Sequence, residues 1–203
     1  RAPAPAGGAP AQGDTVLVGQ GVPAGAKQGP ARQAAILAGL GWDVPTVTIN
    51  KLCLSGLTAI IDAARLVRTG EASVVVAGGP EAMSHWRHLA VRSRSGSAFG
   101  DVTKADSLTH DGLNDPFSGE VMGELTDRGC ATRGIGRPEQ DAFALRSHQR
   151  AAAARDAGRL AEEIAPVEVP QRRGEPVVVE HGEGVRAAAP REGGGRLRAA
   201  GGG

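Results

Sequence analysis

Hydrophobic and polar positions follow a regular pattern in the front part of the chain. A valine-rich apolar run at 14–19 predicts a buried β-strand, and the β-branched alternation at 46–50 predicts a second strand. Between them, residues 31–38 predict a short helix, with Pro30 in its first turn and Gly39 past its end. The chain therefore opens as an alternation of strand and helix.

The longest periodic segment lies at 54–69, and Gly70 follows it as a helix stop. Residues 73–79 form a third apolar run, apolar on both faces as in a parallel or central strand. Strand, helix and strand within about thirty residues make a βαβ unit, so the pattern predicts an α/β fold. The predicted apolar face of the long helix consists of Leu54, Leu57, Ile61, Ala64 and Val67.

The pattern weakens after the third strand. Residues 80–136 contain many Gly, Ser and Asp, and so long an irregular stretch is uncommon unless it is a functional insertion. Residues 138–156 then predict another helix, with a proline in its first turn and acidic residues near its start. Two short apolar runs, 164–170 and 177–180, predict strands that pair with each other.

Composition narrows the function classes. The net charge is +1 with both signs spread along the chain, and aromatic residues make up 2%, so a basic, stacking surface for nucleic acid is not expected. The two cysteines are far apart and lack CxxC spacing, which argues against a disulfide scaffold and a zinc site.

The two ends of the chain contain no core-forming pattern. Residues 1–13 predict a disordered segment or linker, and 187–203 a low-complexity tail. No secretory signal and no apolar run of membrane-spanning length occurs, so we expect a cytoplasmic protein with no membrane partner. The first residue is Arg rather than Met, which favours a fragment.

Cys53 is the candidate nucleophile, because it lies where the second strand runs into the long helix. A helix N-terminus lowers the pKa of a thiol, and its free amides can stabilise the oxyanion of an acyl-transfer intermediate. Ser55 and Gly56 keep the surroundings small enough for a thioester to approach. The alternative is a buried structural cysteine in a leucine-rich turn; position alone does not separate the two.

The segment around Cys53, INKLCLSGLTAI at 49–60, resembles the acyl-cysteine motif of the thiolase family, the acetyl-CoA C-acetyltransferases. It keeps the Asn three residues before the Cys and the Ser-Gly after it. Further segments resemble the family in the same order, from about Asp14 to Arg186: 28–35, 76–84, 111–113, 122–123, 134–135 and 139–149.

The resemblance implies a mechanism. Cys53 would accept an acyl group from acyl-CoA, and a second acyl-CoA, deprotonated at its α-carbon, would attack the thioester; the reverse reaction is thiolysis. Coenzyme A thioesters would be substrates, with no cofactor, no metal and a place in fatty acid metabolism. Met122 would line the acyl pocket, and the full-length protein would be a homo-oligomer.

The resemblance also implies an architecture, a layered αβαβα core of two similar halves with a loop domain inserted in the first. Residues 14–84 would be a partial N-terminal core with an incomplete sheet, and 85–186 the loop domain. The family's first strand, expected upstream of Asp14 and in the middle of the sheet, is absent. Two strands would then have unpaired edges, so we expect the isolated chain to be poorly stable or oligomeric.

Other departures from the family concern its catalytic partners. The family's His in an HPxG-type motif and second Cys in a CxGGG-type motif have no counterpart in the chain, and Cys130 matches neither. Val121 occupies a place where many thiolases have His. Two functions therefore remain open: a thiolase front half, or a non-catalytic remnant that binds acyl-CoA or dimerises. A ketoacyl synthase is a third, remoter option.

Several other polar residues have weaker signals. Glu81 follows a glycine turn, and we expect it to hydrogen-bond backbone amides in a structural role. His110 and Asp111 resemble a metal or acid–base pair only superficially. We expect His148, in the alanine-rich helix, to cap or pack.

Overall fold

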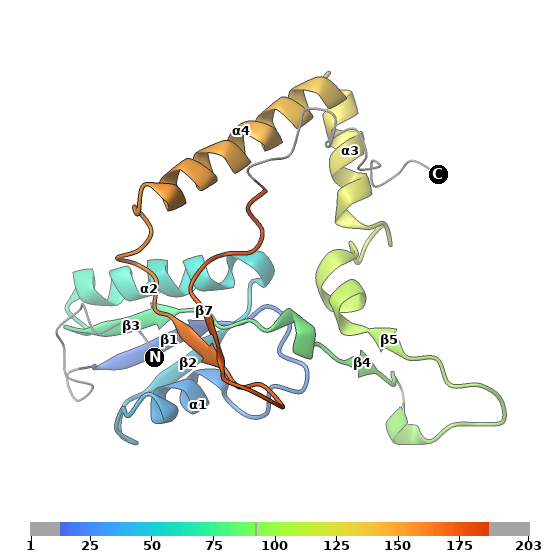
Figure 1. Cartoon of the computed structure of the whole chain (residues 1–203). Helices are drawn as coiled ribbons and strands as arrows, with labels where there is room; N and C mark the ends of the chain where they lie inside the picture. Colours follow the sequence, from blue (N-terminus) through green and yellow to red (C-terminus); the bar gives the residue numbers. More distant parts are fainter. Residues whose placement is uncertain (1–12, 92, 187–203) are drawn as a thin grey trace. The chain divides into compact units, whose positions relative to one another are not determined.

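The computed structural model describes residues 13–91 and 93–186. They fall into two compact units, one ending at Val121 and the other beginning at Met122, and each is described by itself. Figure 1 shows the elements of both units in chain order. The predicted tail at 187–203 lies outside the described residues, as does nearly all of the predicted linker at 1–13.

The first unit is built on a three-stranded parallel sheet, which confirms the α/β fold class. Its strands are β1 (Thr15–Gly19), β2 (Thr46–Ile49) and β3 (Val75–Gly78), in the order β2-β1-β3. Val16 of β1 aligns with Thr46 on one side and Val76 on the other. The predicted strands therefore form where the apolar runs placed them.

The sheet is incomplete, as predicted, but the expectation that its middle strand is missing is wrong. β1 is paired along both edges, and an amide–carbonyl bond of 2.9 Å from Asp14 to Val74 extends its pairing with β3. β3, predicted to be a parallel or central strand, is parallel and lies at one edge of the described sheet. The unpaired edges are consequently the outer ones, on β2 and β3, among the residues that the structure describes.

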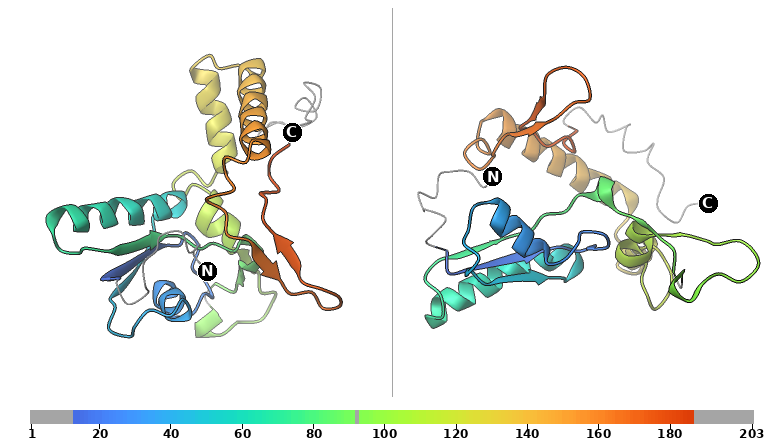
Figure 2. Two further views of the ribbon diagram at one scale, coloured as in Figure 1. Left: turned by 60° about the vertical axis from the view of Figure 1, so that its left-hand side comes forward. Right: turned by 90° about the horizontal axis from the view of Figure 1, so that it is seen from below.

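Two helices cover opposite faces of this sheet, as Figure 2 shows. They are α1 (Pro30–Leu37) and α2 (Ser55–Thr69), close to their predicted bounds. Alternate residues of β1 point to opposite faces. One face packs Val16, Val18 and Val44 against Ala31 and Ala35 of α1, and the other packs Leu17 against Ala59 and Ala63 of α2.

The predicted apolar face of α2 is not the buried one. Leu57 is 52% exposed and Ile61 is 42% exposed, whereas Ala59 is fully buried. The buried residues of α2, namely Ser55, Ala59 and Ala63, are small because the helix approaches the strands closely, and Leu66 packs beside them half-buried. Larger side chains at these positions would have no room.

The rest of the first unit is mostly irregular, as predicted. It contains three-residue 3₁₀ turns η4 (Met83–His85) and η5 (Ser93–Ser95), and a two-stranded antiparallel pair, β4 (His88–Leu89) with β5 (Ala105–Asp106). A short π-helix, η6 (Thr109–Leu113), was not predicted.

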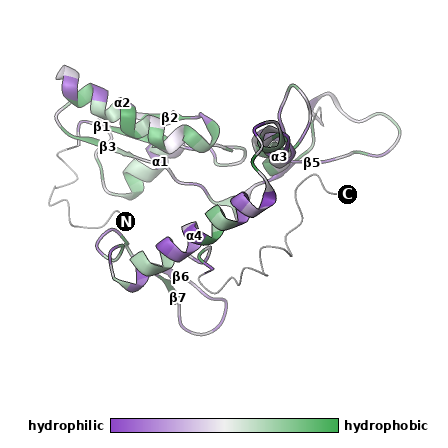
Figure 3. Ribbon diagram, turned by 90° about the horizontal axis from the view of Figure 1, so that it is seen from above, coloured by the Kyte–Doolittle hydropathy of each residue, from purple (hydrophilic) through white to green (hydrophobic). Residues whose placement is uncertain are grey.

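The second unit contains two helices and a hairpin. α3 (Met122–Thr132) was not predicted, since glycines and polar residues obscure its period, whereas α4 (Arg137–Asp156) was. Polar and apolar residues are intermixed along α4 in Figure 3. β6 (Val167–Val169) and β7 (Val177–Val179) pair antiparallel, which confirms the predicted strand pair.

In the described residues, no helix has the length and apolar character needed to cross a membrane. The same parts of the chain contain no group of three or more His, Cys, Asp or Glu that could hold a metal ion.

Candidate active site

Cys53 lies in a 3₁₀ turn, η3 (Leu52–Leu54), between the end of β2 and the start of α2. Cys53 is exposed, so the alternative of a buried structural cysteine is wrong. The turn leads directly into a helix of 15 residues, whose first amides have no acceptor inside the helix. Cys53 therefore combines access from solvent with the electropositive end of a helix dipole.

The turn begins with an unusual backbone conformation. Leu52 has a φ of 50°, and among the described residues it shares a positive φ with only one other non-glycine, Lys27. A branched side chain in this region costs free energy, so the surroundings must hold it there. Such strain next to a candidate nucleophile is typical of functional sites.

Ser55 holds this conformation from the first position of α2. Its buried hydroxyl accepts a bond of 2.8 Å from the Lys51 amide and donates one of 2.6 Å to the Leu52 carbonyl. The hydroxyl thus satisfies one backbone group on each side of the peptide that connects Lys51 to Leu52.

Asn50 joins the turn to a neighbouring loop. Its side-chain Oδ1 accepts a bond of 3.0 Å from the Leu52 amide, and its Nδ2 donates one of 3.0 Å to the Gly21 carbonyl. Gly21 lies in the loop after β1. The ends of β1 and β2 are therefore connected through one amide side chain.

Glycines allow the backbone to come together around the cysteine turn. A Cβ on Gly19 would lie 2.3 Å from the carbonyl carbon of Ser55, and one on Gly79 would lie 2.8 Å from the Gly19 carbonyl oxygen. Real Cβ contacts are not this short, so the start of α2 lies directly against the ends of β1 and β3. No side chain fits between them.

Comparison with known proteins identifies the family. Residues 5–200 match the family model of the thiolase N-terminal domain. The chain belongs to the thiolase family. It is 53% identical over 172 residues to a probable acetyl-CoA acetyltransferase of Mycobacterium leprae, and 44% identical over 185 residues to an acetyl-CoA acetyltransferase of Chromobacterium violaceum.

A solved acetyl-CoA acetyltransferase has a similar fold. The crystal structure of the Bacillus anthracis acetyl-CoA acetyltransferase superposes with a TM-score of 0.86 at 34% identity, covering 92% of this chain. The chain spans less than half of each relative: 44% of the M. leprae protein, 47% of the C. violaceum protein and 47% of the solved one.

The other residues singled out in this thiolase chain belong to other elements than the Cys53 turn. Met122, the first residue of α3, is 48% exposed, and its role in an acyl pocket stays a prediction. His110 and Asp111 are adjacent, exposed and joined by a contact of 2.6 Å. His148 accepts a bond of 3.2 Å from the Arg186 amide, and its predicted capping or packing role stays a prediction.

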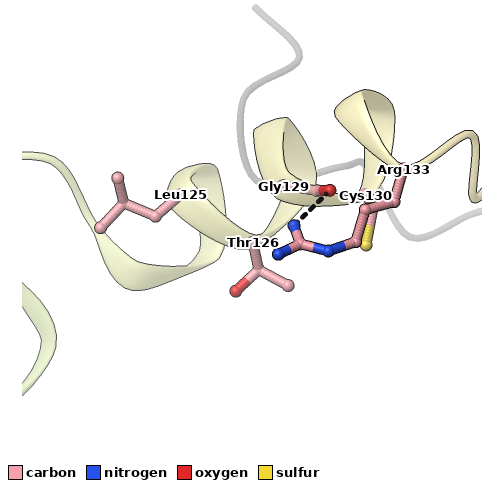
Figure 4. Close-up of a pocket in the computed structure, with 5 residues that line it drawn as sticks. All are labelled: Leu125, Thr126, Gly129, Cys130 and Arg133. Atoms are coloured by element: carbon pink, nitrogen blue, oxygen red, sulfur yellow. Dashed lines mark hydrogen bonds between the residues drawn. The ribbon is translucent and has the colours of Figure 1, made fainter.

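Cys130, the second thiol, lies on α3. Figure 4 shows it in an open depression of about 310 Å³, lined also by Leu125, Thr126, Gly129 and Arg133. The Arg133 guanidinium donates a bond of 3.0 Å to the Gly129 carbonyl. Unlike Cys53, this half-buried thiol belongs to the last part of a helix rather than its start.

Glu81 behaves as its position after a glycine turn predicted. Its carboxylate accepts bonds from the amides of Gly21 and Val22, which confirms the expected hydrogen bonds to backbone amides. Sequence reasoning missed the hydroxyl of Ser55 as the support of the turn. The usable signal was a Ser three residues after the strained position, a spacing at which hydroxyls commonly bond to backbone groups.

Proposed function

We propose that this chain is the acyl-accepting front half of a thiolase, in which Cys53 forms an acyl-cysteine intermediate. The whole reaction would be condensation of two acyl-CoA molecules or its reverse, 3-ketoacyl-CoA thiolysis. Its substrates would be coenzyme A thioesters, with no further cofactor.

One observation supports this proposal above the others. Cys53 is exposed at the start of α2, on a turn whose strained residue is held by Ser55 and Asn50. The thiolate is the form of a cysteine that attacks a thioester carbonyl, and a reactive cysteine is typically found at a helix N-terminus. The free amides of the first turn can then stabilise the oxyanion that forms.

Selective alkylation tests the activated cysteine. The chain is treated with limiting iodoacetamide, and the modified sites are located and quantified by mass spectrometry. Cys130, half-buried on α3, is an internal reference in the same molecule. We expect Cys53 to react faster than Cys130; a rate no higher than that of Cys130 would contradict the proposal. Cys53→Ser and Cys130→Ser variants confirm the assignment of each site.

A second candidate function is a non-catalytic module that binds acyl-CoA or dimerises. It is favoured by the lack of any His-Pro or Cys-x-Gly-Gly sequence in the 203 residues. The two candidates differ in one measurable step. A catalytic half transfers the acetyl group of labelled acetyl-CoA to Cys53, whereas a binding module retains acetyl-CoA without a covalent product.

The setting of the protein is proposed on the same basis. We infer a cytoplasmic enzyme of fatty acid metabolism that works as a homo-oligomer. The relatives that support this inference are named as acetyl-CoA acetyltransferases.

A further inference from the structure

Glu81 reaches from the segment after β3 to the loop after β1. Its Oε2 accepts a bond of 2.7 Å from the Gly21 amide and one of 3.3 Å from the Val22 amide. Its Oε1 accepts a bond of 3.0 Å from the indole Nε1 of Trp86. Both carboxylate oxygens therefore accept hydrogen bonds, Oε2 from two backbone amides and Oε1 from the indole.

The loop that Glu81 binds is the one that contacts the cysteine turn. Gly21 gives its amide to Glu81 and its carbonyl to Asn50, whose Oδ1 in turn accepts the Leu52 amide. A continuous series of hydrogen bonds thus runs from Glu81 to the residue before Cys53.

The three groups are also in close contact. A Cβ on Gly21 would lie 3.4 Å both from Glu81 Oε2 and from the carbonyl group of Leu52. The loop after β1 therefore lies beside both the carboxylate and the cysteine turn. Displacing the loop would remove the acceptor of Asn50 Nδ2 and release the amide side chain that holds Leu52.

We propose that Glu81 is a positioning residue for Cys53, holding the cysteine turn in place through Gly21 and Asn50. The carboxylate does not touch the thiol in this path; it fixes the backbone from which the thiol projects. This inference rests on the proposed function of Cys53 and adds to it the residue that connects the ends of all three strands of the sheet.

The substitution Glu81→Gln separates positioning from charge. The Gln side chain has a single acceptor oxygen, and its other terminal group is an NH2 donor. Either the two backbone amides or the indole N–H would therefore face this donor and lose their acceptor. Positioning predicts that Cys53 then reacts with iodoacetamide more slowly, by roughly tenfold, because the displaced turn no longer holds the thiol at the helix N-terminus that activates it. A charge effect alone predicts the opposite sign, since removing a nearby negative charge favours the thiolate.

A second substitution provides the rescue. Trp86→Phe removes the indole donor, so in the Glu81→Gln/Trp86→Phe double variant the Gln oxygen is free to accept the two backbone amides. We expect this variant to regain the Cys53 rate of Trp86→Phe alone. Glu81→Ala/Trp86→Phe has no acceptor and should remain slow. A merely stabilising role for Glu81 would change the melting temperature without this pattern of Cys53 rates.

Each outcome has a defined meaning. Glu71→Gln, at the far end of α2, is the matched control for lost charge and should leave the Cys53 rate unchanged. A Glu81→Gln rate equal to or above that of the wild type overturns the positioning role while the nucleophile proposal stands. If Cys53 does not outpace Cys130 in the wild-type chain, the proposed function fails and the positioning role fails with it. Should Glu81→Gln alone unfold, the comparison between Trp86→Phe and the double variant decides.

Discussion

At the scale of single residues, Ser55 is the side chain on which the cysteine turn depends most directly. Ser55→Ala removes the acceptor of the Lys51 amide and the donor to the Leu52 carbonyl while changing little volume. We expect a loss of about 1–3 kcal/mol in the free energy of unfolding, because two backbone groups lose their partner, and slower alkylation of Cys53. Urea unfolding measures the first effect. Ser147→Ala, on an exposed position of α4, is the control.

Gly19 is a second residue whose identity is imposed by contact. A Cβ there would lie 2.3 Å from a backbone atom of Ser55 and 2.4 Å from the amide nitrogen of Gly56, and neither can move aside cheaply. We expect Gly19→Ala to destabilise the chain by about 3 kcal/mol or more. Gly56→Ala meets nothing within 4 Å and should be neutral or stabilise by up to about 1 kcal/mol. Equal melting temperatures for the two variants would contradict this.

Sequence reasoning found single residues where local chemistry alone decides. Cys53 was placed at a strand–helix junction and Glu81 at a glycine turn, and both positions follow from short-range patterns. The loop that Glu81 binds could not be predicted in the same way, because Gly21 is 60 residues away along the chain. Only the parallel pairing of β1 with β3 brings the two together.

At the scale of elements, α2 shows why a correct helix can have a wrongly assigned face. Its sequence contains two stripes, a small one that includes Ser55, Ala59 and Ala63, and one of large apolar residues. Hydrophobic periodicity gives weight to the large stripe. The sheet instead selects the small one, because the glycines at the strand ends bring the helix close. The large stripe remains exposed.

The connection between β1 and β3 includes a carboxylate, and this gives an element-scale prediction on pH. Hydrogen bonds from the backbone amides of Val74 and Ser73 hold the pKa of Asp14 below its ordinary value. The pKa of Asp14 is therefore lower in the folded chain than in the unfolded chain, where it is about 3.9. The stabilisation is fully present above that value and is lost as the pH falls through the folded pKa.

Asp14→Asn tests this linkage, because one oxygen, Oδ2, accepts both amides and the Asn oxygen can take its place, so that the change removes the negative charge that strengthens these bonds. We expect the variant to be less stable than the wild type at pH 7, with the difference shrinking as the pH is lowered from about 4. Urea unfolding of both proteins between about pH 3 and pH 7, from about one unit below to about three units above the unfolded pKa, measures it. A difference that stays constant over this range would contradict the assignment.

At the scale of the whole molecule, the exposed apolar stripe and the open sheet edges predict self-association. Leu57 and Ile60 are each 52% exposed on α2, and the outer edges of β2 and β3 lack a strand partner among the described residues. Burying two such side chains in a contact contributes about 1 kcal/mol or more each. We therefore expect the purified chain to form oligomers, measured by light scattering after size-exclusion chromatography.

The variant Leu57→Lys/Ile60→Lys should weaken this association by roughly tenfold or more. Val102→Lys is the matched control, since Val102 is 53% exposed but lies in a loop away from the helix. A wild-type chain that is monomeric and melts cooperatively would contradict the prediction. Equal association of the two lysine variants would assign the contact to the strand edges instead.

Turnover is a property of the whole chain, and we expect the 203 residues alone to stop after one chemical step. Acylation needs only the thiolate and an oxyanion site, which the Cys53 turn and α2 can provide. Passing the acyl group on requires a base for the α-carbon of acyl-CoA or for the coenzyme A thiol. Glu81 has both oxygens engaged, and the family's His-Pro and Cys-x-Gly-Gly motifs do not occur.

Labelled acetyl-CoA should therefore acetylate Cys53 to at most one equivalent, and the Cys53→Ser variant should not be acetylated. Acetoacetyl-CoA and coenzyme A should remain unconverted. Sustained thiolysis by the chain alone would show that another of its own residues is the base.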